Sequence, residues 1–138
     1  MILTGNKIIE EVKSGKIEIA LFDKKRITTN SYDLSLGDTL IRYKTDVIDP
    51  KQKTPHEEIK ILADGLVLQA GEFVLGHSKE RIGSDFYVPL IHGKSGTARM
   101  GLFVHVTADL IDIGSHGVTT FQLYATLPVR LHAGMLIA

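Results

Sequence analysis

The stretch LVLQAGEFVLGH, residues 66–77, decides the fold class. Two apolar runs, Leu66–Leu68 and Phe73–His77, flank the turn dipeptide Ala70-Gly71, a pattern typical of two strands joined by a turn. Further strand signals, with turn residues between them, lie at residues 17–21, 39–43, 58–62, 86–92, 102–107, 117–126 and 129–131. Many short strands with few helices predict a β-sandwich or β-barrel.

The N-terminus differs from the rest of the chain. Apolar residues between Ile8 and Val12 follow helical spacing, Thr4 or Asn6 can cap the free N–H groups, and Gly15 can end the helix. We therefore expect one short N-terminal helix before the strands begin. Residues 44–57 are polar and contain two prolines, so this stretch predicts an exposed loop.

Composition excludes several classes of function. The 138 residues fit a single domain, 1–138, with no linker or internal repeat. The chain has no cysteine, which removes disulfides, thiol nucleophiles and thiolate-bound zinc, including the zinc site of nucleobase deaminases. The six histidines are not paired at metal-ligand spacing, so no zinc site is expected.

Charge and hydropathy also limit the partners. Lys+Arg and Asp+Glu are both 16, so a broad cationic surface for nucleic acid or membrane is not expected. No apolar run could span a membrane and the N-terminus does not read as a leader peptide, which favours a cytoplasmic protein.

The segment Gly93-Lys-Ser-Gly-Thr-Ala-Arg99 is the first candidate site. Glycines let the backbone approach an anion, Lys94 and Arg99 supply charge, and Ser95 and Thr97 supply hydroxyl donors. This chemistry suits a phosphate chain. The alternative interpretation is a solvated turn whose cations pair with nearby carboxylates.

A second candidate lies at Asp112, between Ile111 and Ile113 and just before a glycine turn. A carboxylate in an apolar setting needs a partner or a role. If residues 104–124 fold as a hairpin, Asp112 and residues 120–122 can line one pocket wall. The alternative is a turn aspartate bonded to local backbone N–H groups.

Ordered motifs along most of the chain carry a family resemblance. They are Asn30-Ser-Tyr-Asp-Leu-Ser-Leu-Gly37, Gly93-Lys-Ser-Gly-Thr-Ala-Arg-Met-Gly-Leu102, His105-Val-Thr-Ala108, Leu110-Ile-Asp-Ile-Gly114 and Arg130-Leu-His-Ala-Gly-Met-Leu-Ile137. This series resembles the dCTP deaminase and trimeric dUTPase family, in its deaminase branch. The resemblance implies a distorted β-barrel or jelly roll, a homotrimer with sites between subunits, and chemistry without zinc.

The resemblance also implies roles for individual residues. The triphosphate would be held by Lys94, Ser95, Gly96, Thr97, Ala98 and Arg99, with Ser95 and Arg99 also near the catalytic centre. Asp112 would meet the deoxyribose and activate water in a dUTPase reaction. The backbone at Thr107 and Ala108 would place water and base, and Thr120, Phe121 and Gln122 would face the pyrimidine. Asp33 would act through water on Mg²⁺, which arrives with the nucleotide.

Five departures from the family pattern bear on function. Lys94 replaces an arginine, Gly96 a serine and Ile113 a proline, and none of these changes disables the site. The chain also ends at Ala138, so we expect no C-terminal arm to close the site. Most importantly, Gln122 replaces the glutamate that moves protons in the deaminases, and a carboxamide cannot act as a general acid or base.

Three functions remain open after these departures. The first is hydrolysis of dUTP to dUMP and pyrophosphate, with Asp112 as general base, because Asp112 is kept and the glutamate is not. The second is zinc-independent deamination of dCTP, with proton transfer through another group such as His105 or His116. The third is a trimeric nucleotide-binding module without turnover.

Overall fold

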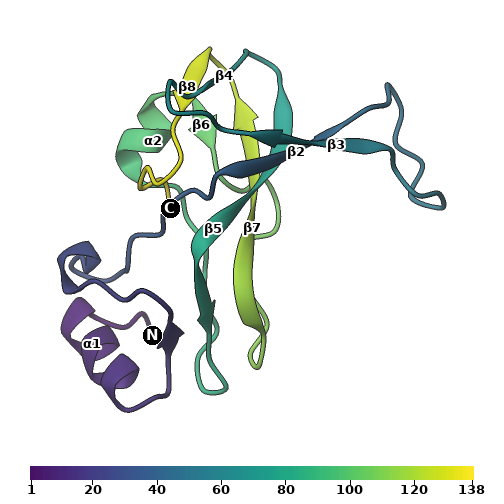
Figure 1. The fold of residues 1–138 in the computed structure, drawn as a ribbon. Coiled ribbons are helices and arrows are strands. Elements are labelled where there is room, and N and C mark those ends of the chain that lie inside the picture. The colour runs from purple at the N-terminus through teal and green to yellow at the C-terminus, as the bar shows by residue number, and fades with distance from the viewer.

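The computed structural model describes residues 1–138, and its centre is an antiparallel pair of two long strands. These are β5 (Phe73–Gly83) and β7 (His116–Ala125). They lie inside a sheet of order β3-β2-β5-β7-β6, while β1 pairs with the far end of β5 and β4 pairs with β8 (Figure 1). The remaining strands are β1 (Glu18–Ile19), β2 (Thr39–Tyr43), β3 (His56–Lys60), β4 (Leu66–Leu68), β6 (Leu102–Phe103) and β8 (Val129–Leu131). This mainly β, antiparallel architecture confirms the predicted fold class.

Side chains alternate between core and surface along these two strands, as the two-residue period of a strand requires. On β7, Phe121 and Leu123 are fully buried in a cluster of 16 apolar residues, whereas Gln122 and Tyr124 lie on the outer face. Gly76 faces inward on β5, where an added Cβ would lie 3.1 Å from the side chain of Leu123. The alternation therefore places Gln122 outside the core.

The N-terminal part, defined here as residues 1–38 before β2, packs beside the end of the β5–β7 pair where Gly83 meets His116 (Figure 1). Its helix α1 (Gly5–Lys13) is capped by the Thr4 hydroxyl, which accepts from the N–H of Lys7 at 3.4 Å. Ile8 on this helix is buried, and Gly15 follows the helix with φ +77°, a conformation that favours glycine. The predicted short helix is confirmed.

A buried ionic network ties the N-terminal part to β5. The carboxylate of Glu80 is fully buried and accepts from the backbone N–H of Ser35 at 2.9 Å and from the Ser35 hydroxyl. It also pairs with Arg26, which lies on the 3₁₀ turn η1 (Lys24–Arg26). Burial opposes ionisation of Glu80, but these donors outweigh it and lower the pKa of its carboxyl.

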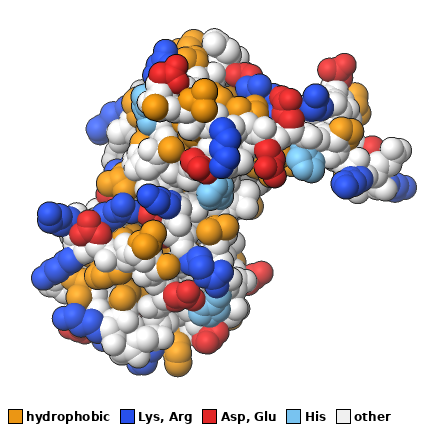
Figure 2. All heavy atoms as spheres, in the orientation of Figure 1, with side chains coloured by type: hydrophobic (Ala, Val, Ile, Leu, Met, Phe, Trp, Pro, Cys, Tyr) orange, Lys and Arg blue, Asp and Glu red, His pale blue; other side chains and the backbone are white.

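The connection between β2 and β3 projects from the body of the protein, where Figure 2 shows both basic and acidic side chains on it. Residues 44–53 are all exposed, which agrees with the exposed loop predicted there. No helix in the chain has the length and hydropathy needed to cross a membrane.

Three of the strand predictions need correction. Residues 86–92 form no strand and contribute only a bridge between Leu90 and Leu110, because the Ser84 hydroxyl turns the chain at residues 86–87 and Pro89 has no N–H. The strand expected at 102–107 ends at Phe103, and Ser95–Arg99 forms a short helix, α2, where the alternative interpretation had a solvated turn. Conversely, β5 runs six residues beyond His77, through a register shift between His77 and Arg81.

Candidate functional site

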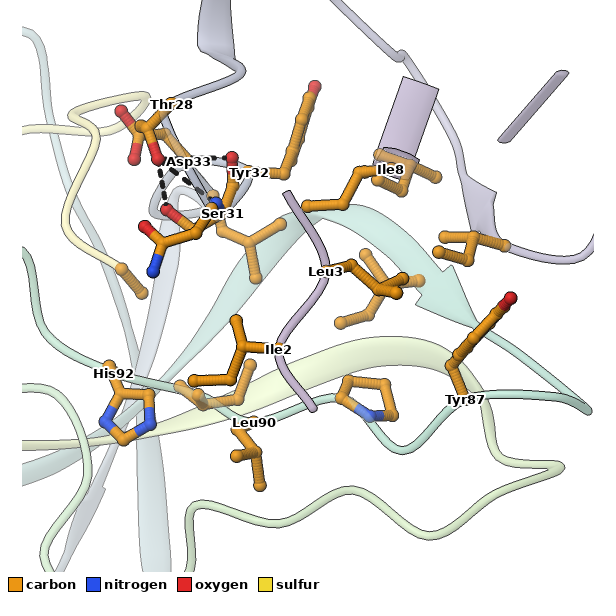
Figure 3. Close-up of a pocket in the computed structure, with 18 of the residues that line it drawn as sticks. Ile2, Leu3, Ile8, Thr28, Ser31, Tyr32, Asp33, Tyr87, Leu90 and His92 are labelled. Carbon is orange, nitrogen blue, oxygen red and sulfur yellow. Dashed lines mark hydrogen bonds between the residues drawn. The ribbon is translucent and has the colours of Figure 1, made fainter. Parts of the chain in front are cut away.

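The larger hollow of the protein, called the helix-side cleft, lies between the N-terminal part and the segment 87–96 and has a volume of about 820 Å³. Figure 3 shows Ile2, Leu3 and Ile8 on its apolar side, with Thr28, Ser31 and Asp33 grouped at another side. Four of the predicted site residues line it: Asp33, Lys94, Ser95 and Gly96. The structure thus brings the predicted magnesium residue to the predicted phosphate segment.

Within this cleft, the ammonium of Lys94 contacts the carboxylate of Asp33, whose side chain is only 13% exposed. The Lys94 backbone is fixed as well: its N–H donates to Ile137 at 3.0 Å, and its carbonyl accepts from Ala98 at 2.9 Å. This ion pair matches the alternative interpretation, in which a cation of the segment pairs with a carboxylate. Because both partners face the cleft, a phosphate that contacts Lys94 competes with Asp33.

The residues of the phosphate segment that follow Lys94 form helix α2, and the helix turns some of them away from the cleft. Gly96 has open space beside it, so nothing blocks a ligand there. Thr97 is buried, whereas Ala98 and Arg99 are exposed and lie outside the cleft lining. Only the first half of the predicted segment therefore faces the cleft.

A second hollow, called the β7 pocket, has a volume of about 460 Å³. It forms because residues 109–111 pair with residues 89–91, through Ile91 N–H to Asp109 O at 2.7 Å and Ile111 N–H to Pro89 O at 3.0 Å, instead of with β7. Its lining comprises Ile82, Ile91, Ala108, Leu110, Ile111, Ser115, His116, Gly117, Val118, Thr119, Thr120 and Gln122. Of the predicted site residues, it contains Ala108, Thr120 and Gln122.

The predicted hairpin of residues 104–124 is thus only partly correct. Gln122 joins its two sides, because its N–H donates to Val104 at 2.9 Å and its Oε1 accepts from the N–H of Val106 at 3.0 Å. Beyond Val106 the chain leaves β7 and opens the pocket. Phe121 points into the core, so its side chain does not face the pocket.

Asp112 and Thr107 are exposed and line neither hollow. Asp112 nevertheless sits at the rim of the β7 pocket, since its neighbours Ile111 and Ser115 both line it. Its carbonyl accepts from the N–H of Ser115 at 3.1 Å, which forms the turn before β7. No side-chain hydrogen bond holds its carboxylate to the local backbone, contrary to the alternative interpretation.

Two histidine rings meet near both candidate segments, although sequence reasoning did not pair them. His92 and His105 form an edge-to-face contact with ring centroids 5.7 Å apart. Nδ1 of His105 is buried without a hydrogen-bond partner. The sequence held one indication of this contact: His92 directly precedes the candidate segment that begins at Gly93, and His105 begins the motif His105-Val-Thr-Ala108.

No group of three or more His, Asp or Glu side chains in the chain could hold a metal ion. Asp33 offers one carboxylate in the helix-side cleft, and carboxylate oxygen is a ligand type that Mg²⁺ prefers. A single carboxylate suits an ion that brings phosphate oxygens and waters of its own.

Comparison with known proteins assigns the chain to a family. A family model described as dCTP deaminase-like matches residues 2–138. The chain belongs to this dCTP deaminase-like family.

Two curated relatives of this dCTP deaminase-like chain carry the same name. A "dCTP deaminase, dUMP-forming" from Clostridium beijerinckii is 42% identical over 132 residues, which are 96% of this chain and 76% of that protein. A protein of the same name from Leptospira biflexa is 36% identical over 137 residues, covering 99% of this chain and 78% of that one.

A solved structure shares the fold of the chain. It is the 2'-deoxycytidine 5'-triphosphate deaminase from Agrobacterium tumefaciens, with a TM-score of 0.75 and 20% identity. The match covers 99% of this chain but only 46% of that one, so this chain spans less than half of the Agrobacterium protein. At this identity the likeness concerns the fold, and it agrees with the jelly-roll-like architecture expected from the sequence.

Proposed function

We propose that the chain hydrolyses a pyrimidine deoxynucleoside triphosphate between its α and β phosphates, and that dUTP, giving dUMP and pyrophosphate, is the favoured substrate. The observation that carries this proposal is the polar lining of the β7 pocket, which contains no carboxylate. Its only titratable side chain is His116, and both ring nitrogens of His116 face carboxylates outside the pocket, those of Glu18 and Asp85. Deamination needs a group that moves protons at the base, and Gln122 cannot do so.

Hydrolysis does not need a proton-transfer group at the base, but it needs groups that bind and stabilise the phosphates. In this proposal Lys94 releases Asp33 and contacts the phosphate chain, while Ser95 and the open backbone at Gly96 add donors in the same cleft. Asp33 would hold, through water, the Mg²⁺ that arrives with the nucleotide, and the ion would supply positive charge to the phosphates. Arg99 is exposed and free to approach the triphosphate from outside the cleft.

Asp112 is the general base of the proposed reaction. Its exposed carboxylate takes a proton from water as that water attacks the α-phosphorus, the bond from that phosphorus to the bridging oxygen breaks, and pyrophosphate leaves. Asp112 lies at the rim of the β7 pocket and not in its lining, where Gln122 lies, which fits a role beside the sugar and the α-phosphate.

We further propose that the chain acts as a homotrimer, in which the two hollows of neighbouring copies complete one site. Seven of the predicted site residues are divided between the hollows: Asp33, Lys94, Ser95 and Gly96 line the helix-side cleft, and Ala108, Thr120 and Gln122 line the β7 pocket. Leu90, Leu110, Ile113 and Val118, around the β7 pocket, are each at least half exposed. Large exposed apolar side chains gathered in one place favour burial by association. Sedimentation equilibrium tests this, and a monomer at all concentrations would contradict it.

The name of the relatives supports a second candidate, the deamination of dCTP. A protein called a dUMP-forming dCTP deaminase yields the product proposed here, but from dCTP. Purified protein incubated with Mg²⁺ and either dUTP or dCTP, with ammonia and pyrophosphate measured separately, distinguishes the two reactions. We expect pyrophosphate from dUTP and no ammonia from dCTP, whereas ammonia release by the unaltered chain would favour the second candidate.

The variant Gln122→Glu sharpens this comparison, because it restores a group that can carry a proton. If ammonia release from dCTP arises only in this variant, the natural chain is not a deaminase. Nucleotide binding with no product from either substrate would identify a binding module and refute both reactions.

A further inference from the structure

Gln122 is held in one orientation by the segment opposite it. Its backbone N–H donates to Val104, and its side-chain oxygen accepts from the N–H of Val106 at 3.0 Å. A backbone N–H can only donate, so the side-chain atom that meets Val106 must be the oxygen Oε1 and not the nitrogen Nε2. The direction of the carboxamide therefore follows from the chemistry of its partner.

This orientation determines what Gln122 offers to a ligand. Oxygen and nitrogen lie on opposite sides of the flat carboxamide, so the NH₂ group points away from Val106. Nε2 makes no hydrogen bond within the chain, and Gln122 lines the β7 pocket. The free group that Gln122 presents is thus a hydrogen-bond donor.

The other polar side chains of the β7 pocket have no comparable preference. The hydroxyls of Ser115, Thr119 and Thr120 can rotate to donate or to accept. The ring of His116 is occupied, with Nδ1 2.6 Å from Glu18 and Nε2 3.3 Å from Asp85. Gln122 is therefore the lining side chain whose free polar group can only donate a hydrogen bond.

Uracil and cytosine differ at the position that such a donor can distinguish. Both bases carry an acceptor at O2, but at position 4 uracil has the acceptor oxygen O4 and cytosine has a donating amino group. We propose that Gln122 selects uracil nucleotides by donating a hydrogen bond from Nε2 to O4. With cytosine, the carboxamide and the amino group would both be donors, and both would lose a partner in the pocket. This inference rests on the proposed function, because it assumes that the β7 pocket receives the base.

Equilibrium binding of the α,β-imido analogues of dUTP and dCTP, with Mg²⁺, tests the inference without requiring turnover. For the unaltered protein we expect the dUTP analogue to bind about 10- to 100-fold more tightly, the usual cost of a donor left unpaired. In Gln122→Glu one carboxylate oxygen keeps the bond from Val106 and the other can only accept, so the preference should invert toward the dCTP analogue.

Two further variants complete the experiment. Gln122→Met keeps a similar length but has no donor, and its two affinities should agree within about threefold. Gln69→Glu makes the same amide-to-acid change at an exposed residue that lines neither hollow, and it should keep the original preference. Circular dichroism and thermal midpoints confirm that each variant is folded, and if Gln122→Glu does not fold, Gln122→Met still provides the test.

Equal affinities in the unaltered protein, or a preference that survives in Gln122→Met, would overturn the inference. Failure of the dUTP analogue to bind, alone or together with the dCTP analogue, would also overturn it, because the β7 pocket would then not receive uracil. The outcomes that refute the proposed hydrolysis are different. A protein that prefers the dUTP analogue but releases no pyrophosphate from dUTP supports the selectivity and refutes the hydrolysis. A protein that hydrolyses dUTP but binds both analogues equally supports the hydrolysis and refutes the selectivity.

Discussion

Lys94 and Asp33, 61 positions apart in the chain, form an ion pair on the wall of the helix-side cleft. Both residues were expected to act on the same triphosphate: Lys94 by direct contact with the phosphates, and Asp33 through magnesium. Their contact means that, without a nucleotide, the ammonium of Lys94 is paired with the carboxylate of Asp33. In the proposed reaction, phosphate would replace Asp33 beside Lys94, and magnesium would replace Lys94 beside Asp33.

Removing this lysine should weaken substrate binding. We expect Lys94→Ala to raise KM for dUTP by about tenfold or more, because a hydrogen bond from a charged donor contributes about 1.5–3 kcal/mol. Lys94→Arg should retain most of the affinity, since it keeps the charge. The matched control is Lys60→Ala, which breaks a pair with Asp38 at 3.2 Å that is outside both hollows. Equal effects of Lys94→Ala and Lys60→Ala on KM would contradict the placement of the phosphates.

The exposed carboxylate of Asp112 should matter for turnover and little for stability. We expect Asp112→Asn to lower kcat for dUTP hydrolysis by about 10²- to 10⁴-fold, the usual contribution of a general base. Because the side chain is exposed, the thermal midpoint should stay nearly unchanged. Asp109→Asn, three residues earlier, serves as control and should leave kcat within about twofold. An active Asp112→Asn enzyme would remove Asp112 from the mechanism.

Much of the fold could be predicted from the sequence because its signals are local. The alternation of β7 and the turn glycines are visible in single segments, and three strands have the predicted bounds: Thr39–Tyr43, Leu66–Leu68 and Val129–Leu131. The strand predicted at 86–92 failed because the hydroxyl of Ser84 turns the chain, an interaction that no periodicity reveals.

The candidate site was harder to predict, because it depends on pairings between distant segments. The motifs identified Lys94 and Asp33, but nothing in the sequence indicated that they touch. The β7 pocket exists because residues 109–111 pair with 89–91, and the orientation of Gln122 depends on the N–H of Val106. Both are tertiary hydrogen bonds between residues far apart in sequence, which local patterns do not encode.

Buried Glu80 should be essential for stability. Glu80→Gln leaves Arg26 without its counter-charge in a part-buried position, and breaking a buried pair in this way typically costs about 3–5 kcal/mol of unfolding free energy. Urea unfolding measures the loss. Glu58→Gln, the same exchange at an exposed residue of β3, should change the unfolding free energy by less than about 0.5 kcal/mol. Similar midpoints for the two variants would show that the network contributes nothing specific.

His116 should make stability depend on pH. Its hydrogen bond to Glu18, followed by that to Asp85, raises the pKa of His116 above its ordinary value of 6.5, and the same contact lowers the pKa of Glu18. A raised pKa in the folded state stabilises the protein fully below the unfolded value and loses this effect as pH rises through the folded value. Arg81, 3.5 Å from Glu18, is the other charge in this group.

Thermal midpoints of the unaltered protein and of His116→Gln measure this dependence. The difference between them should be largest between about pH 5 and pH 6.5, where His116 is protonated and Glu18 is ionised, and should shrink toward about pH 9. Below about pH 4.5 it should shrink again, as Glu18 takes up a proton. His132→Gln, at an exposed residue outside this group, should show no such profile. A difference independent of pH would mean that His116 acts through packing alone.

The proposed reaction cuts a pyrimidine deoxynucleoside triphosphate between its α and β phosphates. Phosphorus NMR of dUTP incubated with the purified protein and Mg²⁺ distinguishes the bonds, because cleavage of each gives different products. We expect the three dUTP resonances to be replaced by those of dUMP and pyrophosphate in equal amounts. Release of orthophosphate, which reports cleavage between the β and γ phosphates, or dUTP that stays intact over many hours, would contradict it.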